Sequence, residues 1–280
     1  MIKINFFQAG YCIHPEAIVI QGGRWKISNF PSICALISHP QFGYILYDAG
    51  YSHRFFQETR NFPFRLYALM TPVYFQSEDG ISAQLQTEGI SPEAIQYIII
   101  SHFHADHVGG LSDFPNAKFV CFQSAYNAVK SRQGFRALKA GFLPGLMPSN
   151  FVERAIFVES KNQVSLPSAY APFDTGFDIF GDGSILAVEL PGHATGQLGL
   201  FVTDRDNQTY FLIADACWLR RAYQEFIAPH PIANILFSNR GEYVDTLQKI
   251  HQLHKLNSAI KIIPTHCQDT WEKLKLQRYE

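Results

Sequence analysis

The chain has 280 residues, of which 47% are hydrophobic and 17% charged, with a formal net charge of −1. This composition excludes a disordered protein, and the lack of a basic stripe argues against a nucleic-acid partner. No run of about 18 apolar residues occurs, which argues against a membrane span. Because the five cysteines form no CxxC pair and the N-terminus has no signal-peptide pattern, we expect a cytoplasmic protein.

Short strands separated by turn-forming residues are predicted at 2–7, 17–21, 32–38 and 43–48. Residues 51–80 form an aromatic-rich insertion that is interrupted by Pro63 and Pro72. Three interpretations of this insertion are open: core packing under a loop, a wall of an apolar substrate pocket, or a homodimer contact.

The rest of the chain alternates between predicted helices and strands. Helices are expected at 81–88, 124–140 and 243–256, with a short one near the C-terminus. Strands are expected at 97–100, 118–122, 155–159, 177–180, 185–190, 199–203, 210–214 and 260–264. No linker divides the chain, so we predict a single domain over 1–280 that includes the insertion at about 51–80.

A dense cluster of metal-ligating side chains follows the apolar run Tyr97–Ile100. Within six positions lie His102, His104, Asp106 and His107. Imidazole and carboxylate are ligands that zinc, iron and manganese accept. Because four such groups at this density are costly unless something binds them, the cluster predicts a metal site rather than a polar loop.

Further ligand-type residues come directly after other apolar strands. Five predicted strands each carry such a residue just past the C-terminal end: Asp48, His102, His193, Asp215 and His266. Strand ends along one edge of a sheet bring distant segments together. We therefore expect these side chains to form one site.

The pattern His102-x-His104-x-Asp106-His107, followed by His193, Asp215 and His266, resembles the metallo-β-lactamase superfamily. The resemblance spans nearly the whole chain and implies an α+β fold, the four-layer αββα sandwich of two mixed sheets with helices outside. It implies two divalent metal ions, zinc first, with iron, manganese or cobalt as alternatives.

The resemblance also implies a role for each ligand. One ion would be held by His102, His104 and His193, a second by Asp106, His107 and His266, and Asp215 would bridge them. Asp48, in an early Asp-x-Gly turn, would orient a ligating histidine. Cys217 and Cys267 each lie within two positions of an implied ligand and could reach a metal, but they are expected to be buried hydrophobic side chains. Ordinary polar roles are expected for His14, His39, His53, His230, His251 and His254.

Within the superfamily the chain is most similar to the N-acyl-homoserine lactonase group, at residues 47–50, 101–110, 191–196 and 215–217. This implies a metallohydrolase that opens a lactone or similar carboxylic ester by attack of a metal-bridging hydroxide. Asp106 or Asp215 would be the catalytic proton carrier. The partner would be a small-molecule substrate with an apolar part.

One position departs from that group. Those lactonases have a tyrosine three residues after the bridging aspartate, and this chain has Trp218, whose indole donates one N–H but is no phenol acid. Trp218 and the nearby Tyr223 are the predicted substrate contacts. The alternatives are a thioester hydrolase like glyoxalase II, a phosphodiester hydrolase of the same fold, or a non-catalytic metal-containing binding protein.

Overall fold

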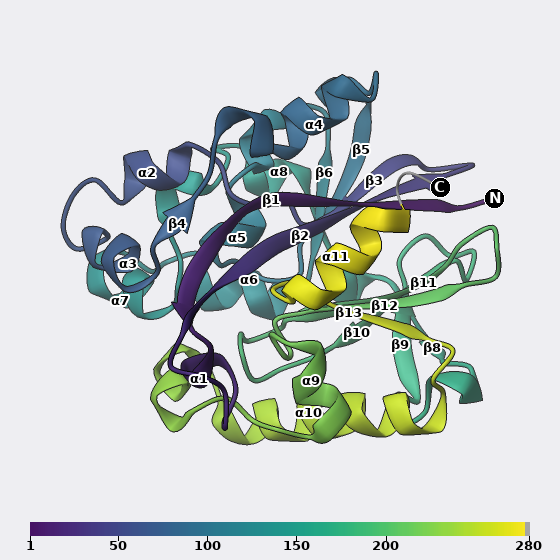
Figure 1. Ribbon diagram of the computed structural model, residues 1–280. Helices are drawn as coiled ribbons and strands as arrows, with labels where there is room; N and C mark the ends of the chain where they lie inside the picture. The colour runs from purple at the N-terminus through teal and green to yellow at the C-terminus, as the bar shows by residue number, and fades with distance from the viewer. Residues whose placement is uncertain (278–280) are drawn as a thin grey trace.

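The computed structural model describes residues 1–277, so the last three residues of the predicted domain lie outside the description. Two β-sheets face each other, and helices α4 and α10 lie at opposite ends of the stack (Figure 1). Each sheet contains both parallel and antiparallel strand pairs. This is the predicted αββα sandwich of two mixed sheets.

The first sheet has seven strands in the order β4-β1-β2-β3-β5-β6-β7. The long β1–β2 pair is antiparallel, whereas β3, β5, β6 and β7 run parallel to one another. The strands are β1 (Lys3–Pro15), β2 (Ile27–His39), β3 (Gly43–Tyr47), β4 (Val73–Tyr74), β5 (Ile95–Ile99), β6 (Lys118–Cys121) and β7 (Ala155–Phe157).

The second sheet has six strands in the order β13-β12-β11-β10-β9-β8. All of its pairs are antiparallel except β12–β13, which is parallel. The strands are β8 (Asn162–Ser165), β9 (Thr175–Asp178), β10 (Ile185–Glu189), β11 (Leu198–Thr203), β12 (Thr209–Ala214) and β13 (Lys261–Pro264).

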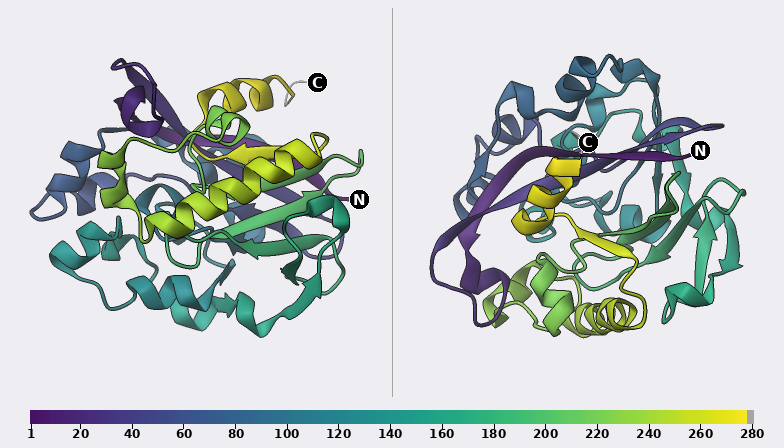
Figure 2. Two further views of the ribbon diagram at one scale, coloured as in Figure 1. Left: turned by 90° about the horizontal axis from the view of Figure 1, so that it is seen from below. Right: turned by 45° about the vertical axis from the view of Figure 1, so that its right-hand side comes forward.

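Helices surround the two sheets, as the further views show (Figure 2). In the described part of the chain, no helix is both long and apolar enough to cross a membrane. The helices are α1 (Glu16–Val19), α2 (Arg54–Glu58), α3 (Arg65–Met70), α4 (Ile81–Thr87), α5 (Ala105–Val108), α6 (Gln123–Val129), α7 (Gly134–Lys139), α8 (Phe151–Arg154), α9 (Arg220–Glu225), α10 (Arg240–Leu256) and α11 (Gln268–Gln277).

Side chains that alternate between the two faces of the second sheet explain why it lies between the first sheet and helix α10. Leu200 and Leu212 belong to the core that the second sheet shares with the first. Their neighbours Phe201 and Phe211 belong to a second core together with Leu247 of α10. Successive side chains of a strand point to opposite faces, so this sheet is buried on both sides.

Two expectations about local structure were wrong, and strand β8 was missed. Residues 16–19 form helix α1 rather than a strand, although Ala17 and Val19 are still buried. The helix expected at 124–140 is two helices, because the chain leaves the helical conformation within residues 130–133, with Gln133 extended (φ −137°, ψ 157°) and Gly134 at a φ of +53° where the second helix begins. Strand β8 was not predicted, because its side chains are mostly exposed and lack an apolar face.

The aromatic insertion combines core packing with exposed surface. Tyr51 and Phe55 are buried and pack edge to face with ring centroids 5.5 Å apart. Phe62 and Leu69 are 68% and 66% exposed. The interpretation as core packing therefore holds for the first part of the insertion, and the homodimer contact stays a prediction.

Candidate metal centre

The predicted ligands meet where strands of the two sheets end. The turn after β5 carries His102 and His104, and the short helix α5 that follows carries Asp106 and His107. In the second sheet, His193 follows β10, Asp215 follows β12 and His266 follows β13. Folding thus brings together segments that are up to 164 residues apart, from 102 to 266.

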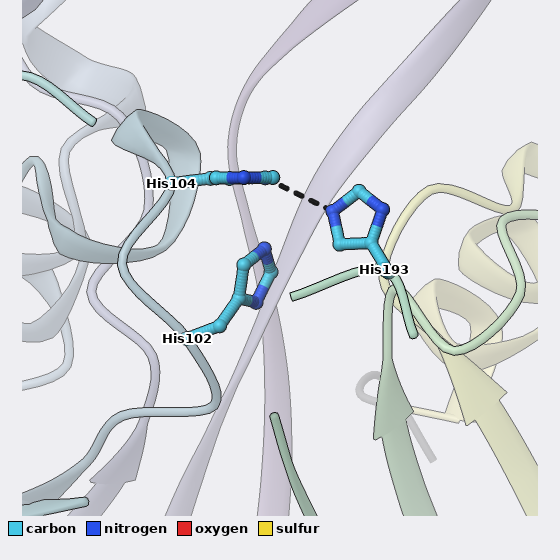
Figure 3. A group of neighbouring side chains, drawn as sticks. All are labelled: His102, His104 and His193. Carbon is cyan, nitrogen blue, oxygen red and sulfur yellow. Dashed lines mark hydrogen bonds between the residues drawn. The ribbon is translucent and has the colours of Figure 1, made fainter. Parts of the chain in front are cut away.

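The first group of ligands consists of His102, His104 and His193 (Figure 3). Each offers one donor atom, and the three atoms lie within 4.8 Å of one another. The His193 Nε2 and His104 Nδ1 atoms are 2.9 Å apart. Three imidazoles in this arrangement can surround one metal ion.

The second group consists of Asp106, His107, Asp215 and His266, again with donor atoms within 4.8 Å of one another. The His266 Nε2 atom lies 3.0 Å from Asp106 Oδ2 and 3.1 Å from Asp215 Oδ2. Asp215 also reaches the first group, since its Oδ2 atom is 3.3 Å from His193 Nε2. Its carboxylate therefore lies between the two groups.

Asp48 orients His107 from behind. Its Oδ2 atom accepts hydrogen bonds from His107 Nδ1 at 2.7 Å and from the Ser101 hydroxyl at 2.7 Å. Its Oδ1 atom accepts the Ser101 backbone N–H at 2.8 Å. With the proton of His107 held on Nδ1, the Nε2 lone pair is available to a metal. The Pro31 carbonyl does the same for His266, accepting from Nδ1 at 2.7 Å.

Buried nitrogen and oxygen atoms that lack a hydrogen-bond partner indicate whether a metal ion fits this site. Four buried atoms of the two groups have no hydrogen-bond partner: His102 Nε2, His107 Nε2, His193 Nδ1 and Asp215 Oδ1. Buried polar atoms are nearly always hydrogen-bonded, and here even His107 Nε2 and Asp215 Oδ1, which are 3.3 Å apart, form no hydrogen bond, so the group favours a bound ligand. Five imidazoles and two carboxylates form a donor set that suits zinc, iron or manganese. The residues fit a pair of divalent ions.

Protonation differs between the two groups. Burial lowers the pKa of His102 and His104, and it lowers the pKa of His193 to about 3, so these imidazoles are neutral, as ligation requires. In the second group burial opposes ionisation, but the nearby carboxylates raise the pKa of His107 well above its usual range. Asp215 and Asp106 likewise raise the pKa of His266 to about 10.

The corresponding carboxyl groups are ionised. Burial alone would raise their pKa, but His107 and His266 hold the pKa of Asp106 well below its usual range. Asp215 has a depressed pKa because His266, His107 and His193 surround it. The second group is therefore an ion-pair network, in which metal ions would replace protons as the counter-charge.

An apolar cavity of about 300 Å³ opens onto this centre. His104, Asp106, His193, Asp215 and His266 form its polar end. Most of the other walls are apolar or aromatic: Ile18, Val19, Phe30, Tyr51, Tyr67, Met70, Phe135, Leu138, Trp218, Ile235 and Leu236. The interpretation of the insertion as a pocket wall holds for Tyr51, Tyr67 and Met70.

Trp218 contacts the centre through its indole nitrogen. The Nε1–H group donates to Asp215 Oδ2 at 2.9 Å, and the ring packs edge to face against His193 with centroids 5.7 Å apart. An indole has a single N–H, and Asp215 already accepts it. Trp218 thus forms a cavity wall and holds the carboxylate, with no proton left to donate to a substrate.

The expectation that Tyr223 contacts the substrate does not fit the structure. Helix α9 directs this side chain into the second core, where its hydroxyl lies 3.4 Å from the Ile262 carbonyl oxygen. It does not line the cavity. Cys217 and Cys267 are buried as expected, and neither belongs to a ligand group.

Sequence reasoning placed Tyr51 and Tyr67 only within the insertion at 51–80, and it missed the cavity residues His14 and Gly141. The position of Tyr51, directly after the turn at 48–50 that carries Asp48, indicates that this side chain lies near the site. His14 was expected to be an ordinary polar residue, yet it lines the cavity. Nothing in the local pattern around Gly141 points to the site.

Gly141 lies directly against a ligand. A Cβ atom built there would be 2.5 Å from His104 Cδ2 and 2.7 Å from Nε2. We expect Gly141→Ala to displace the His104 ring and weaken metal binding by about tenfold or more, as measured by competition with a chromophoric chelator. Gly134→Ala is a matched control, since Gly134 also has a positive φ but a Cβ there meets nothing within 4 Å. Equal metal affinities in the two variants would contradict the contact.

Comparisons with known proteins agree with this geometry. Residues 32–212 match the family described as Metallo-beta-lactamase superfamily. The N-acyl homoserine lactonase AttM of Azorhizobium caulinodans is 26% identical over 242 residues, which are 86% of this chain and 83% of the relative. The N-acyl homoserine lactonase AiiA of Bacillus thuringiensis subsp. kurstaki is 24% identical over 224 residues, with 80% and 79% covered.

Solved structures share the fold. An N-acyl homoserine lactone hydrolase with the product N-hexanoyl-L-homoserine bound at its catalytic metal centre superposes with a TM-score of 0.67 at 19% identity, covering 97% of this chain and 95% of that one. The dizinc quorum-quenching lactonase AidC gives a TM-score of 0.63 at 14% identity, covering 95% and 88%. With the family match over 32–212, the chain belongs to the metallo-β-lactamase superfamily.

Proposed function

We propose that this chain is a dinuclear metal-dependent hydrolase that opens a lactone, or a similar carboxylic ester, in a small molecule with an apolar part. One observation carries the proposal: two groups of histidine and aspartate donors meet at Asp215 at the polar end of an apolar cavity. The sequence relatives named as N-acyl homoserine lactonases support a lactone as the substrate class.

The metal ions and the side chains would have separate tasks. Two divalent ions, zinc by preference of this donor set, would supply water activation at neutral pH and polarisation of the substrate carbonyl. Asp215 faces both ligand groups, with Oδ2 3.3 Å from His193 Nε2 and Oδ1 3.3 Å from His107 Nε2. Asp106 contacts its neighbours through Oδ2 only, within the described residues. We therefore assign proton transfer to Asp106 and the bridging role to Asp215.

The side chains that line the cavity indicate which chemical groups the substrate carries. Apolar side chains around the polar end favour an alkyl or aryl group next to the scissile ester. The tyrosine that assists at the lactone in the resembled group is replaced by Trp218, whose N–H is engaged with Asp215. We infer that this chain opens its substrate without a phenol at that position.

The thiols support the proposed cellular setting. All five cysteines are free and buried. Scattered free cysteines are typical of a reducing compartment, which supports a cytoplasmic location.

The test is turnover by the zinc-loaded protein on a panel of lactones and simple esters. We expect hydrolysis of acyl lactones, loss of activity after treatment with a chelator, and recovery when zinc is returned. Full metal content with no turnover of any lactone or simple ester would refute the proposal. Faster cleavage of an acyl-glutathione or a model phosphodiester would favour the thioester or phosphodiester alternative. Elemental analysis of protein purified without added metal identifies the native ions.

A further inference from the structure

A second cavity, of about 340 Å³, adjoins the apolar one. The two cavities share His104 and His193 of the metal centre, together with Lys139, Ile235 and Leu236. A molecule whose scissile bond lies at the metal centre can therefore extend one part into each cavity.

The second cavity has a different chemical character. Arg132 and Lys139 bring two positive charges to its wall, and Thr195 and Ser238 add hydroxyl groups. Among the described residues that line it there is no aspartate or glutamate. We call it the cationic cavity. Lys139 lines both cavities, and apolar residues also line this one, but Arg132, Thr195 and Ser238 line the cationic cavity and not the apolar one.

Both cations are available to a ligand, Lys139 as an exposed side chain at the cavity rim and Arg132 deeper in its wall. Arg132 is half-buried, and its Nε donates to the Ala128 carbonyl at 2.5 Å, which fixes the guanidinium at the cavity. Within residues 1–277, its remaining N–H groups make no hydrogen bond or ion pair, and the Lys139 ammonium makes none either. By contrast, Arg54 pairs with Asp113 at 2.6 Å. Two neighbouring cations without a counter-charge favour an anion between them.

We propose that the cationic cavity binds a carboxylate group carried by the substrate, at the opposite end of the molecule from its apolar part. The inference rests on the proposed ester hydrolysis at the shared histidines. An arginine fork matches the two oxygens of a carboxylate, and a lysine adds a second positive charge. The preferred substrate is then an amphiphilic ester or lactone, apolar on one side of the scissile bond and anionic on the other.

The test compares two esters of one shape. The naphthyl monoester of glutaric acid ends in a carboxylate, and the naphthyl ester of 5-methylhexanoic acid ends in an isopropyl group of similar size. We expect the zinc-loaded enzyme to prefer the glutarate ester. The double variant Arg132→Gln, Lys139→Gln is expected to lose about tenfold of this preference, mainly through KM. Added salt should weaken the preference of the unmodified enzyme.

Arg136→Gln is the matched control, because Arg136 is an exposed cation on the same helix as Lys139, and it lines neither cavity. A preference that is unchanged in the double variant, or that falls equally in the control, would overturn the proposal. The naphthylamides of the same two acids separate this question from catalysis. If neither ester is cleaved, the binding of the two amides to the zinc-loaded protein is measured by calorimetric titration. The proposal is supported if the glutarate amide binds more tightly and the double variant loses this difference. Equal binding of the two amides refutes it.

Discussion

Replacing His104 with alanine is expected to remove most of the metal affinity of the first group and, with it, turnover. The substitution leaves only His102 and His193 there. A structural zinc site is worth about 10–16 kcal/mol over four ligands, so one ligand contributes about 3 kcal/mol, or roughly a hundredfold in affinity. Competition with a chromophoric chelator measures the affinity, and elemental analysis after gel filtration measures the occupancy.

The control for this variant is His53→Ala, because His53 bonds Ser77 at the surface and belongs to neither group. Two outcomes would be informative against the proposal. An unchanged metal affinity in His104→Ala would remove His104 from the ligand set. A variant that lost its metal yet kept full affinity for a substrate analogue would favour the binding-protein alternative over an enzyme.

Asp48→Asn is expected to lower metal affinity or activity by about 10–100-fold, although Asp48 is not itself a predicted ligand. Both carboxylate oxygens of Asp48 accept hydrogen bonds, from His107 Nδ1, the Ser101 hydroxyl and the Ser101 backbone N–H. An asparagine amide has only one acceptor atom. In either orientation its NH₂ group would face an N–H donor, at Ser101 or at His107.

If the NH₂ group faces His107, it favours the tautomer with the proton on Nε2, which is the atom needed for the metal. The backbone is not expected to suffer, because asparagine tolerates the positive φ of 61° found at position 48. Chelator competition reports the affinity, and ¹⁵N chemical shifts of the His107 ring report the tautomer. Asp113→Asn, which alters a surface pair with Arg54, is the control. Wild-type affinity with an unchanged tautomer in Asp48→Asn would contradict the orienting role.

The positions of the ligand-bearing strands could be predicted from the sequence because each signal is local. Buried strands such as β5 and β12 are continuous apolar runs, and the ligand follows within a few residues of the last apolar position. The same logic placed Asp48 beside the site, since it directly follows β3. Where a ligand-type residue directly follows an apolar run, the run is buried as a strand of the core. The ligand therefore lies at the end of that strand.

The contacts of the cavity walls could not be predicted in this way, because they form between distant segments, although Trp218 and the insertion were proposed from the sequence to line the site. Trp218 reaches Asp215 through a loop that leaves β12 at Ala214, which has an unusual φ of +46°. Tyr67, on helix α3, lines the cavity beside His104 and His266, which are distant from it in the sequence. Arg132 lies between α6 and α7, in a segment that was predicted from the sequence to be one continuous helix.

The division of ligands between the sheets has a consequence for the lifetime of the protein. Each ligand group draws side chains from both sheets: the first joins His102 and His104 to His193, and the second joins Asp106 and His107 to Asp215 and His266. A bound ion is therefore a cross-link between sheets, and this edge of the sandwich cannot open without releasing it. At a free metal concentration about 100 times the dissociation constant, each ion adds about 2.7 kcal/mol to the free energy of unfolding. Metal supply would then govern resistance to proteolysis as well as catalysis.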